Sequence, residues 1–107
     1  MKVYISSRKK DFYAEGEFNI NNRELIIKKG AKVSSEIKYS EKFKGANTIE
    51  KLRNGKIKDN ILQEDISFKS PSTAANFVTG RSTNGLITWK DKSGTKLKEI
   101  IKNTIKE

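Results

Sequence analysis

The segment 68–90 constrains the fold of this chain more than any other, because helix start and stop signals stand at fixed positions within it. Ser70 can cap a helix with its hydroxyl, and Pro71 has the fixed φ that suits the first helical position. Gly80 tolerates the left-handed conformation in which helices often end. The sequence therefore predicts a helix between Pro71 and Gly80.

A turn and a strand are expected directly after this helix. Asn84-Gly85 is typical of a turn, and Leu86 to Lys90 is expected to form a short strand. The single tryptophan, Trp89, stands in this strand beside Leu86 and Ile87, where a core position is more common than an exposed, base-stacking one. We expect five residues of the segment to have structural roles: Ser70, Pro71, Gly80, Gly85 and Trp89.

Apolar and polar residues alternate in the N-terminal third, which is the period of half-buried strands. The alternation includes Val3 and Ile5, then Phe12, Ala14, Gly16, Phe18 and Ile20. We expect an antiparallel meander of three strands over residues 2–6, 11–20 and 24–29. Asn21-Asn22 is a plausible tight turn between the last two strands, because Asn tolerates positive φ.

Short helices are expected around this sheet. Asn47 and Glu50 fit a capping box, and Gly55 is expected to end that helix. Residues 38–45 are predicted to be a polar surface loop, and residues 66–68 a strand that leads into the Ser70 helix.

The C-terminal segment predicts a further helix. Leu97, Ile100, Ile101 and Ile105 recur at helical spacing. A hairpin at 91–94 is the competing assignment for the first residues of this segment. The whole pattern indicates a small α+β fold, one domain over residues 1–107, with an N-terminal antiparallel meander, short helices and a C-terminal helix.

Composition excludes several kinds of chemistry. The chain of 107 residues has no cysteine and no histidine, which excludes disulfides, zinc–thiolate sites, cysteine nucleophiles and Ser-His-Asp triads. No apolar run approaches the roughly 20 residues of a membrane span, and residues 1–5 are followed by charge rather than by a signal-peptide core. We therefore expect a cytoplasmic protein with no membrane partner, no metal and no cofactor.

Positive charge is the feature that points to a partner. Lys and Arg number 23 against 13 Asp and Glu, for a net charge of +10. Such an excess attracts polyanions over about 10 Å at ordinary salt, and nucleic acid is the commonest polyanion in a cell. The alternative is a solvated surface rich in lysine, since 19 of the cations are Lys.

Three segments resemble a known family. Asp11-Phe12-Tyr13-Ala14-Glu15-Gly16, Lys29-Gly30-Ala31-Lys32-Val33 and the segment 68–89 resemble the bacterial domain of unknown function that often follows GIY-YIG endonuclease domains. The last segment is also similar to the restriction-system adenine-methylase-associated (RAMA) domain, with Leu86 where that relative often has Trp. The resemblance covers roughly residues 11–100. It implies association with restriction, DNA modification or DNA processing, and a companion nuclease or methylase domain.

These observations predict a nucleic-acid-binding module, with DNA favoured over RNA, that is not an enzyme. Lysines attract phosphates, whereas Arg and Asn side chains can reach base edges. We expect phosphate contacts from Lys28, Lys29, Lys32 and Arg81, a base contact from Asn84, and a further contact from Lys90. Capping and turn formation account for Ser70 and Asn84 without any ligand. Tyr4, Tyr13 and Phe12 are each open to a core or a base-stacking interpretation.

Two other functions are compatible with the sequence. A protein-interaction domain would present a contiguous apolar patch instead of a cationic groove. A metal-dependent nuclease would use acidic pairs such as Glu15 with Glu17, or the Glu36-Ile37-Lys38 element. Neither acidic group has an additional acidic partner placed convincingly in the sequence, so the nuclease is the weakest of the three hypotheses.

Overall fold

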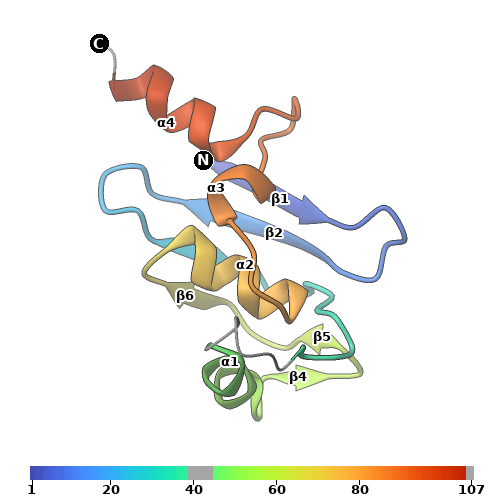
Figure 1. The fold of residues 1–107 in the computed structure, drawn as a ribbon. Helices are drawn as coiled ribbons and strands as arrows, with labels where there is room; N and C mark the ends of the chain where they lie inside the picture. Colours follow the sequence, from blue (N-terminus) through green and yellow to red (C-terminus); the bar gives the residue numbers. More distant parts are fainter. Residues whose placement is uncertain (39–44, 106–107) are drawn as a thin grey trace.

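An antiparallel sheet of four strands forms the centre of the fold (Figure 1). The computed structural model describes residues 1–38 and 45–105. Within them the strands are β1 (Lys2–Ser6), β2 (Tyr13–Phe18), β3 (Leu25–Ile27), β4 (Ile57–Lys58), β5 (Ile61–Leu62) and β6 (Ile66–Phe68), and the helices are α1 (Ala46–Arg53), α2 (Pro71–Thr79), α3 (Gly85–Thr88) and α4 (Leu97–Ile105). The central sheet has the order β1-β2-β3-β6, and β4 pairs with β5 separately. The α+β class predicted from the sequence is confirmed.

The alternation of the N-terminal strands decides which face of the sheet is buried. Val3 pairs with Gly16, Gly16 with Ile27, and Ile27 with Ile66. Because directly paired residues point to the same face, one face is apolar across all four strands. Its fully or nearly buried side chains include Val3, Ile5, Ala14, Phe18, Leu25, Ile27 and Phe68.

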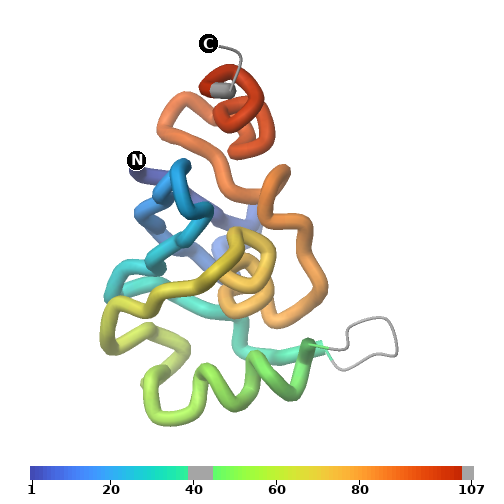
Figure 2. The backbone as a smooth tube through the Cα atoms, turned by 90° about the vertical axis from the view of Figure 1, so that its left-hand side faces the viewer, coloured from blue at the N-terminus to red at the C-terminus, as the bar shows by residue number. Residues whose placement is uncertain are grey.

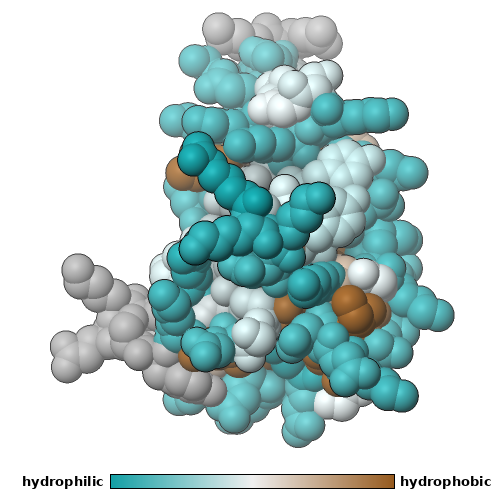
Figure 3. Space-filling model, turned by 90° about the vertical axis from the view of Figure 1, so that its right-hand side faces the viewer, coloured by the Kyte–Doolittle hydropathy of each residue, from teal (hydrophilic) through white to brown (hydrophobic). Residues whose placement is uncertain are grey.

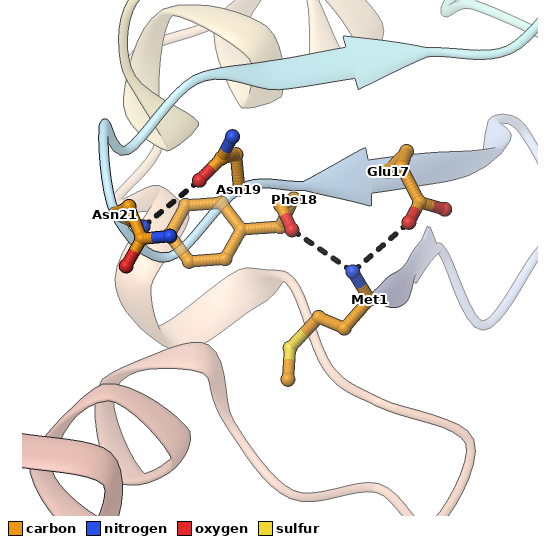
Figure 4. Close-up of polar contacts among 5 residues, drawn as sticks. All are labelled: Met1, Glu17, Phe18, Asn19 and Asn21. Carbon is orange, nitrogen blue, oxygen red and sulfur yellow. Dashed lines mark hydrogen bonds and ion pairs between the residues drawn. The ribbon is translucent and has the colours of Figure 1, made fainter.

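The first predicted strand, over residues 2–6, is confirmed, but β2 and β3 are shorter than predicted, and side-chain hydrogen bonds form the turn between them. β2 covers Tyr13–Phe18 instead of 11–20, and β3 covers Leu25–Ile27 instead of 24–29. The carbonyl oxygen of the Asn19 side chain accepts a hydrogen bond from the backbone amide of Asn21 (2.9 Å), which starts the turn (Figure 4). The positive φ in this turn is at Arg23 (65°), not at the asparagines.

The amino group of Met1 contacts the end of β2. It donates to Glu17 Oε1 and to the carbonyl oxygen of Phe18, both at 2.9 Å (Figure 4). These contacts extend the pairing of β1 with β2 to the last residue of β2.

Helix α2 covers the apolar face of the sheet and has the predicted ends. The Ser70 hydroxyl accepts a hydrogen bond from the backbone amide of Thr73, and Gly80 ends the helix with a φ of 71°. The ring of Phe77 packs against Phe68 of β6, with ring centroids 5.2 Å apart. The buried face of α2 is completed by Ala74, Ala75 and Val78.

The strand predicted over residues 86–90 is wrong. Asn84 accepts a hydrogen bond from the backbone amide of Leu86 on its side-chain oxygen (3.0 Å), and this cap starts the short helix α3 instead. Lys90 alone pairs with the sheet, opposite Tyr4 at the outer edge of β1.

The predicted capping box at Asn47 and Glu50 is also wrong. The N-cap of α1 is Gly45, without a side-chain cap, so Asn47 is already the second residue of the helix. Gly55 does follow the end of α1, with a φ of 78°. The predicted loop at 38–45 falls mostly on residues 39–44, which lie outside the described residues.

The turn at 91–94 and the C-terminal helix are both present. Asp91 accepts hydrogen bonds from the backbone amides of Ser93 and Thr95 on its side chain, both at 2.9 Å. Lys90 then pairs with Lys96 before α4 begins. The hairpin and the helix, which were competing assignments for the first residues of this segment, are thus consecutive elements of the chain.

The helices leave one face of the sheet open. α4 lies at one end of the molecule and α1, with the β4–β5 hairpin, at the other (Figure 1). α2 and α3 lie on the same side of the N-terminal strands (Figure 2). The opposite face carries exposed or half-exposed side chains, among them Tyr4, Tyr13, Glu15 and Ile26. In the described part of the chain, no helix has the length and apolar character needed to cross a membrane.

Candidate nucleic-acid interface

The predicted structural residues form one packed unit at the start of α2. Trp89 is fully buried, and its indole N–H donates to the carbonyl oxygen of Pro71 at 3.0 Å. The backbone amide of Gly85 donates to the Ser72 hydroxyl at 3.1 Å, and a methyl group on Gly85 would collide with the Pro71 carbonyl. The chain itself therefore packs against this helix start, and Trp89 is a core residue that no base can reach.

Gly80 brings Arg81 next to the segment 34–38. The backbone amide of Ser34 donates to the carbonyl of Val78 (2.8 Å), and that of Lys38 donates to the carbonyl of Gly80 (2.7 Å). A methyl group on Gly80 would collide with the Glu36 carbonyl, so the two segments touch through their backbones. Arg81 leaves this contact as an exposed side chain.

A hollow of about 390 Å³ lies where the β1–β2 loop meets this segment, and we name it the loop hollow. The ammonium of Lys32 donates to the carbonyl of Lys10 (3.3 Å), which places the tip of the loop beside the hollow. Three cationic and two acidic side chains line this hollow. The tip of the β1–β2 loop adds three more cations beside it, Arg8, Lys9 and Lys10. The lining residues are Ser7, Asp11, Phe12, Lys32, Ser34, Ser35, Glu36, Lys38, Asn60, Thr79 and Arg81.

A second hollow, of about 190 Å³, lies on the open face of the sheet, and we name it the sheet hollow. A turn shapes it: the amide of Ala31 bonds to the carbonyl of Lys28 (3.4 Å), and Gly30 has a φ of 97°, as the third residue of a type II turn requires. The turn inserts extra residues between Lys28 and Lys32. The sheet hollow is lined by Tyr13, Glu15, Lys28, Lys29, Gly30 and Ala31.

Asp65 holds this turn through both of its carboxylate oxygens. Oδ1 accepts from the backbone amide of Lys29 (2.7 Å), and Oδ2 accepts from the ammonium of Lys28 (2.9 Å). The Lys29 amide and then the Lys28 ammonium hold the pKa of Asp65 below its ordinary value. The same carboxylate raises the pKa of Lys28. Lys28 is therefore fixed in place and partly neutralised, whereas no such partner holds the Lys29 side chain among the described contacts.

The two hollows meet at Tyr13 and Lys32. These residues pair across neighbouring chain segments through two backbone hydrogen bonds, of 2.8 and 2.9 Å, so their side chains share the open face. Seen from the side of the β1–β2 loop, the surface is largely hydrophilic, with small separate hydrophobic spots (Figure 3). Six residues that line the two hollows form what we name the cationic track: Tyr13, Lys28, Lys29, Lys32, Lys38 and Arg81.

A family model matches most of the chain. The model of a domain of unknown function, DUF4357, matches residues 3–101. The chain belongs to this family. The match confirms the resemblance at the level of a domain of unknown function and extends it from roughly 11–100 to nearly the whole chain. Searches of curated proteins and of solved structures found no match.

In this DUF4357 domain, two of the predicted binding residues lie away from the track. Asn84 uses its side-chain oxygen to cap α3. Lys90 pairs with Tyr4, so it shares the open face of the sheet beyond β1, but it lines neither hollow. The structure thus gathers Lys28, Lys29, Lys32 and Arg81 along the two hollows, whereas Asn84 and Lys90 line neither of them.

Sequence reasoning missed the roles of Lys38 and Arg53. Lys38 joins the loop hollow only because its backbone bonds to Gly80. Arg53 is half-buried, and its guanidinium donates to the carbonyl oxygens of Phe77 (2.6 and 3.0 Å) and Ser34 (3.0 Å). A cation there satisfies the unpaired carbonyls at the end of α2. No local signal identifies either role, because both depend on contacts between distant segments.

The acidic side chains named in the nuclease hypothesis lie in different parts of the DUF4357 domain. Glu17 is bonded to the Met1 amino group, and Glu15 lines the sheet hollow. Asp11 lies with Glu36 and Lys38 in the loop hollow. Across residues 1–38 and 45–105, no three Asp or Glu side chains are grouped so that they could hold a metal ion.

Proposed function

We propose that this DUF4357 domain is a non-catalytic nucleic-acid-binding module, with DNA as the favoured partner, and that the partner lies along the cationic track. The observation that carries the proposal is the gathering of five cations from residues 28–32, residue 38 and residue 81 around two adjoining hollows. Such cations release condensed counterions when they meet phosphates, which is the main source of affinity for nucleic acid.

Each cation has a distinct part in the proposal. Lys32, Lys38 and Arg81 bind phosphates at the loop hollow, where Arg81 can engage two phosphate oxygens at once. Lys28 and Lys29 bind the next phosphates at the sheet hollow. The loop cations Arg8, Lys9 and Lys10 add a longer-range attraction that accelerates association.

The resemblance described above supports a biological setting for this activity. The domains that this chain resembles often follow GIY-YIG nucleases or are related to the RAMA domain, so we propose that the module works in the cytoplasm within a restriction or DNA-processing system. A companion nuclease or methylase domain would supply the chemistry, and this module would supply contact with the substrate.

Two alternatives each have one supporting observation. Leu86 and Ile87 are adjacent and exposed on α3, which favours a small protein-interaction surface. Asp11 and Glu36 line the loop hollow together with Lys38, which favours metal-dependent cleavage. The track involves more of the molecule than either feature, so nucleic-acid binding without cleavage is the preferred function.

Fluorescence anisotropy with labelled DNA tests the proposal. We expect binding to both duplex and single-stranded DNA at about 50 mM salt and a loss of affinity of at least tenfold at about 200 mM salt. DNA incubated with Mg²⁺ should remain intact on a gel, since the module does not cleave. Absence of binding at the lower salt concentration would contradict the proposal, and cleavage that a chelator stops would favour the nuclease.

A further inference from the structure

We infer that the nucleic acid on the cationic track is single-stranded and that one of its bases stacks on the ring of Tyr13. This inference rests on the proposed function and specifies the form of nucleic acid that the module binds. It is based on the placement of one exposed aromatic ring among lysines on an open sheet face.

Tyr13 presents an exposed aromatic ring on the open face of the sheet. The residue is 49% exposed, although an aromatic ring gains most free energy when it is buried. Within residues 1–38 and 45–105, Tyr13 is the one aromatic residue among the exposed large apolar side chains. Phe12 and Trp89 are buried, so they are excluded as stacking residues.

Three lysines lie on one side of Tyr13 on the open face. Lys32 is its direct partner across the pairing, and in such pairs the Cβ atoms lie about 4.5–5.5 Å apart. Lys28 and Lys29 line the sheet hollow together with Tyr13. The turn at Gly30 produces this arrangement, because it inserts residues between Lys28 and Lys32 and so brings Lys32 opposite Tyr13. Ser6 of β1 pairs with Tyr13 on the other side, so the phosphates of a base stacked on Tyr13 meet cations on the side of residues 28–32.

A single strand fits this arrangement better than a duplex. The faces of the bases are hidden inside a duplex, so a ring on a sheet can reach them only after a base has left the stack. An aromatic platform on a sheet with cations beside it is a common way to bind single-stranded nucleic acid. A duplex would use only the lysines and the arginine, and would leave the exposed ring without a partner.

Anisotropy with a labelled single-stranded DNA of about 12 nucleotides, and with the duplex of the same sequence, tests the inference. We expect Tyr13→Ala to weaken single-strand binding about 5- to 150-fold, and Tyr13→Phe to retain affinity within about threefold, because the phenyl ring still stacks. The control is Ile26→Ala, an exposed residue of the same sheet face that lies outside both hollows. It should leave affinity unchanged, and circular dichroism should show that all three variants fold.

The outcomes separate this inference from the proposed function. If Tyr13→Ala binds the single strand as well as the wild type does, or if the duplex binds more tightly than the single strand, the inference is wrong and the proposed function stands. If the wild type binds neither form, both are wrong. Selective loss of single-strand affinity in Tyr13→Ala supports both.

Discussion

The indole N–H of Trp89 donates a hydrogen bond to the carbonyl oxygen of Pro71, 3.0 Å away and 18 residues earlier in the chain. The bond joins the end of α3 to the start of α2, where Gly85 also contacts Ser72. The serine, proline, glycine and tryptophan of the most recognisable segment therefore specify one packed unit. At the other end of α2, the Thr79 hydroxyl donates to the carbonyl of Arg81 (3.1 Å) and holds the turn from which Arg81 enters the loop hollow.

Replacing Trp89 should destabilise the fold strongly. Trp89→Phe removes the donor for the buried Pro71 carbonyl and leaves space where the larger indole stood, so we expect a loss of about 2–4 kcal/mol in the free energy of unfolding. Urea denaturation measures it. The control Ile87→Ala, on the exposed side of the same short helix, should change stability by no more than about 0.5 kcal/mol. Equal losses in the two variants would show that the bond to Pro71 contributes little.

Two glycines should differ in how they tolerate alanine. Gly85→Ala places a methyl group against the Pro71 backbone, which cannot move without displacing α2, so we expect a loss of about 2–3 kcal/mol. Gly94→Ala meets no atom within 4 Å but has a φ of 87°, so only the backbone strain remains, about 1 kcal/mol. Thermal unfolding compares the two. A larger loss for Gly94→Ala would contradict the proposed close approach at Gly85.

Asp65 should titrate below the ordinary aspartate value of 3.8. Because its pKa is depressed in the folded state, its contribution to stability is present above the unfolded pKa and is lost as the pH falls through the folded one. Lys28→Met should raise the pKa of Asp65 without restoring 3.8, since the Lys29 amide is the larger cause. NMR titration of the carboxyl group measures both values. A normal pKa in the wild type would exclude the described contacts.

Neutralising Asp65 should strengthen nucleic-acid binding. Asp65→Asn keeps an oxygen acceptor for the Lys29 amide but frees the charge of Lys28, so we expect affinity to rise about threefold at low salt. Glu99→Gln, which removes the same charge from α4, is the matched control and should have a smaller effect. If the two variants gain equally, net charge governs binding and the position of Lys28 does not.

The sequence predicted the parts of the fold that local signals determine. Alternation located β1 to β3, and Ser70 with Gly80 marked both ends of α2. The strand predicted at 86–90 failed because the Asn84 cap outweighed the β-branched residues after it. The capping box at Asn47 failed because the helix begins earlier, at Ala46.

The candidate site was predictable only as a list of cations. Lys28, Lys29 and Lys32 are close in sequence, but their arrangement around Tyr13 depends on the Gly30 turn and on Asp65, which is 36 residues from Lys29. The approach of Arg81 and Lys38 depends on backbone contacts at the end of α2. Charge counting could not separate these residues from Lys90, because it contains no information on distance.

The salt dependence of DNA binding in matched double variants tests the cationic track most directly. Lys32→Met with Arg81→Met removes two charges from the track, whereas Lys98→Met with Lys102→Met removes two exposed charges from α4. The track variant should lower the slope of log affinity against log salt by about 1.4 on a single strand or 1.8 on a duplex, and the α4 variant should leave the slope unchanged. Equal slopes in the two variants would show that DNA binds to a diffuse positive surface and not to the track.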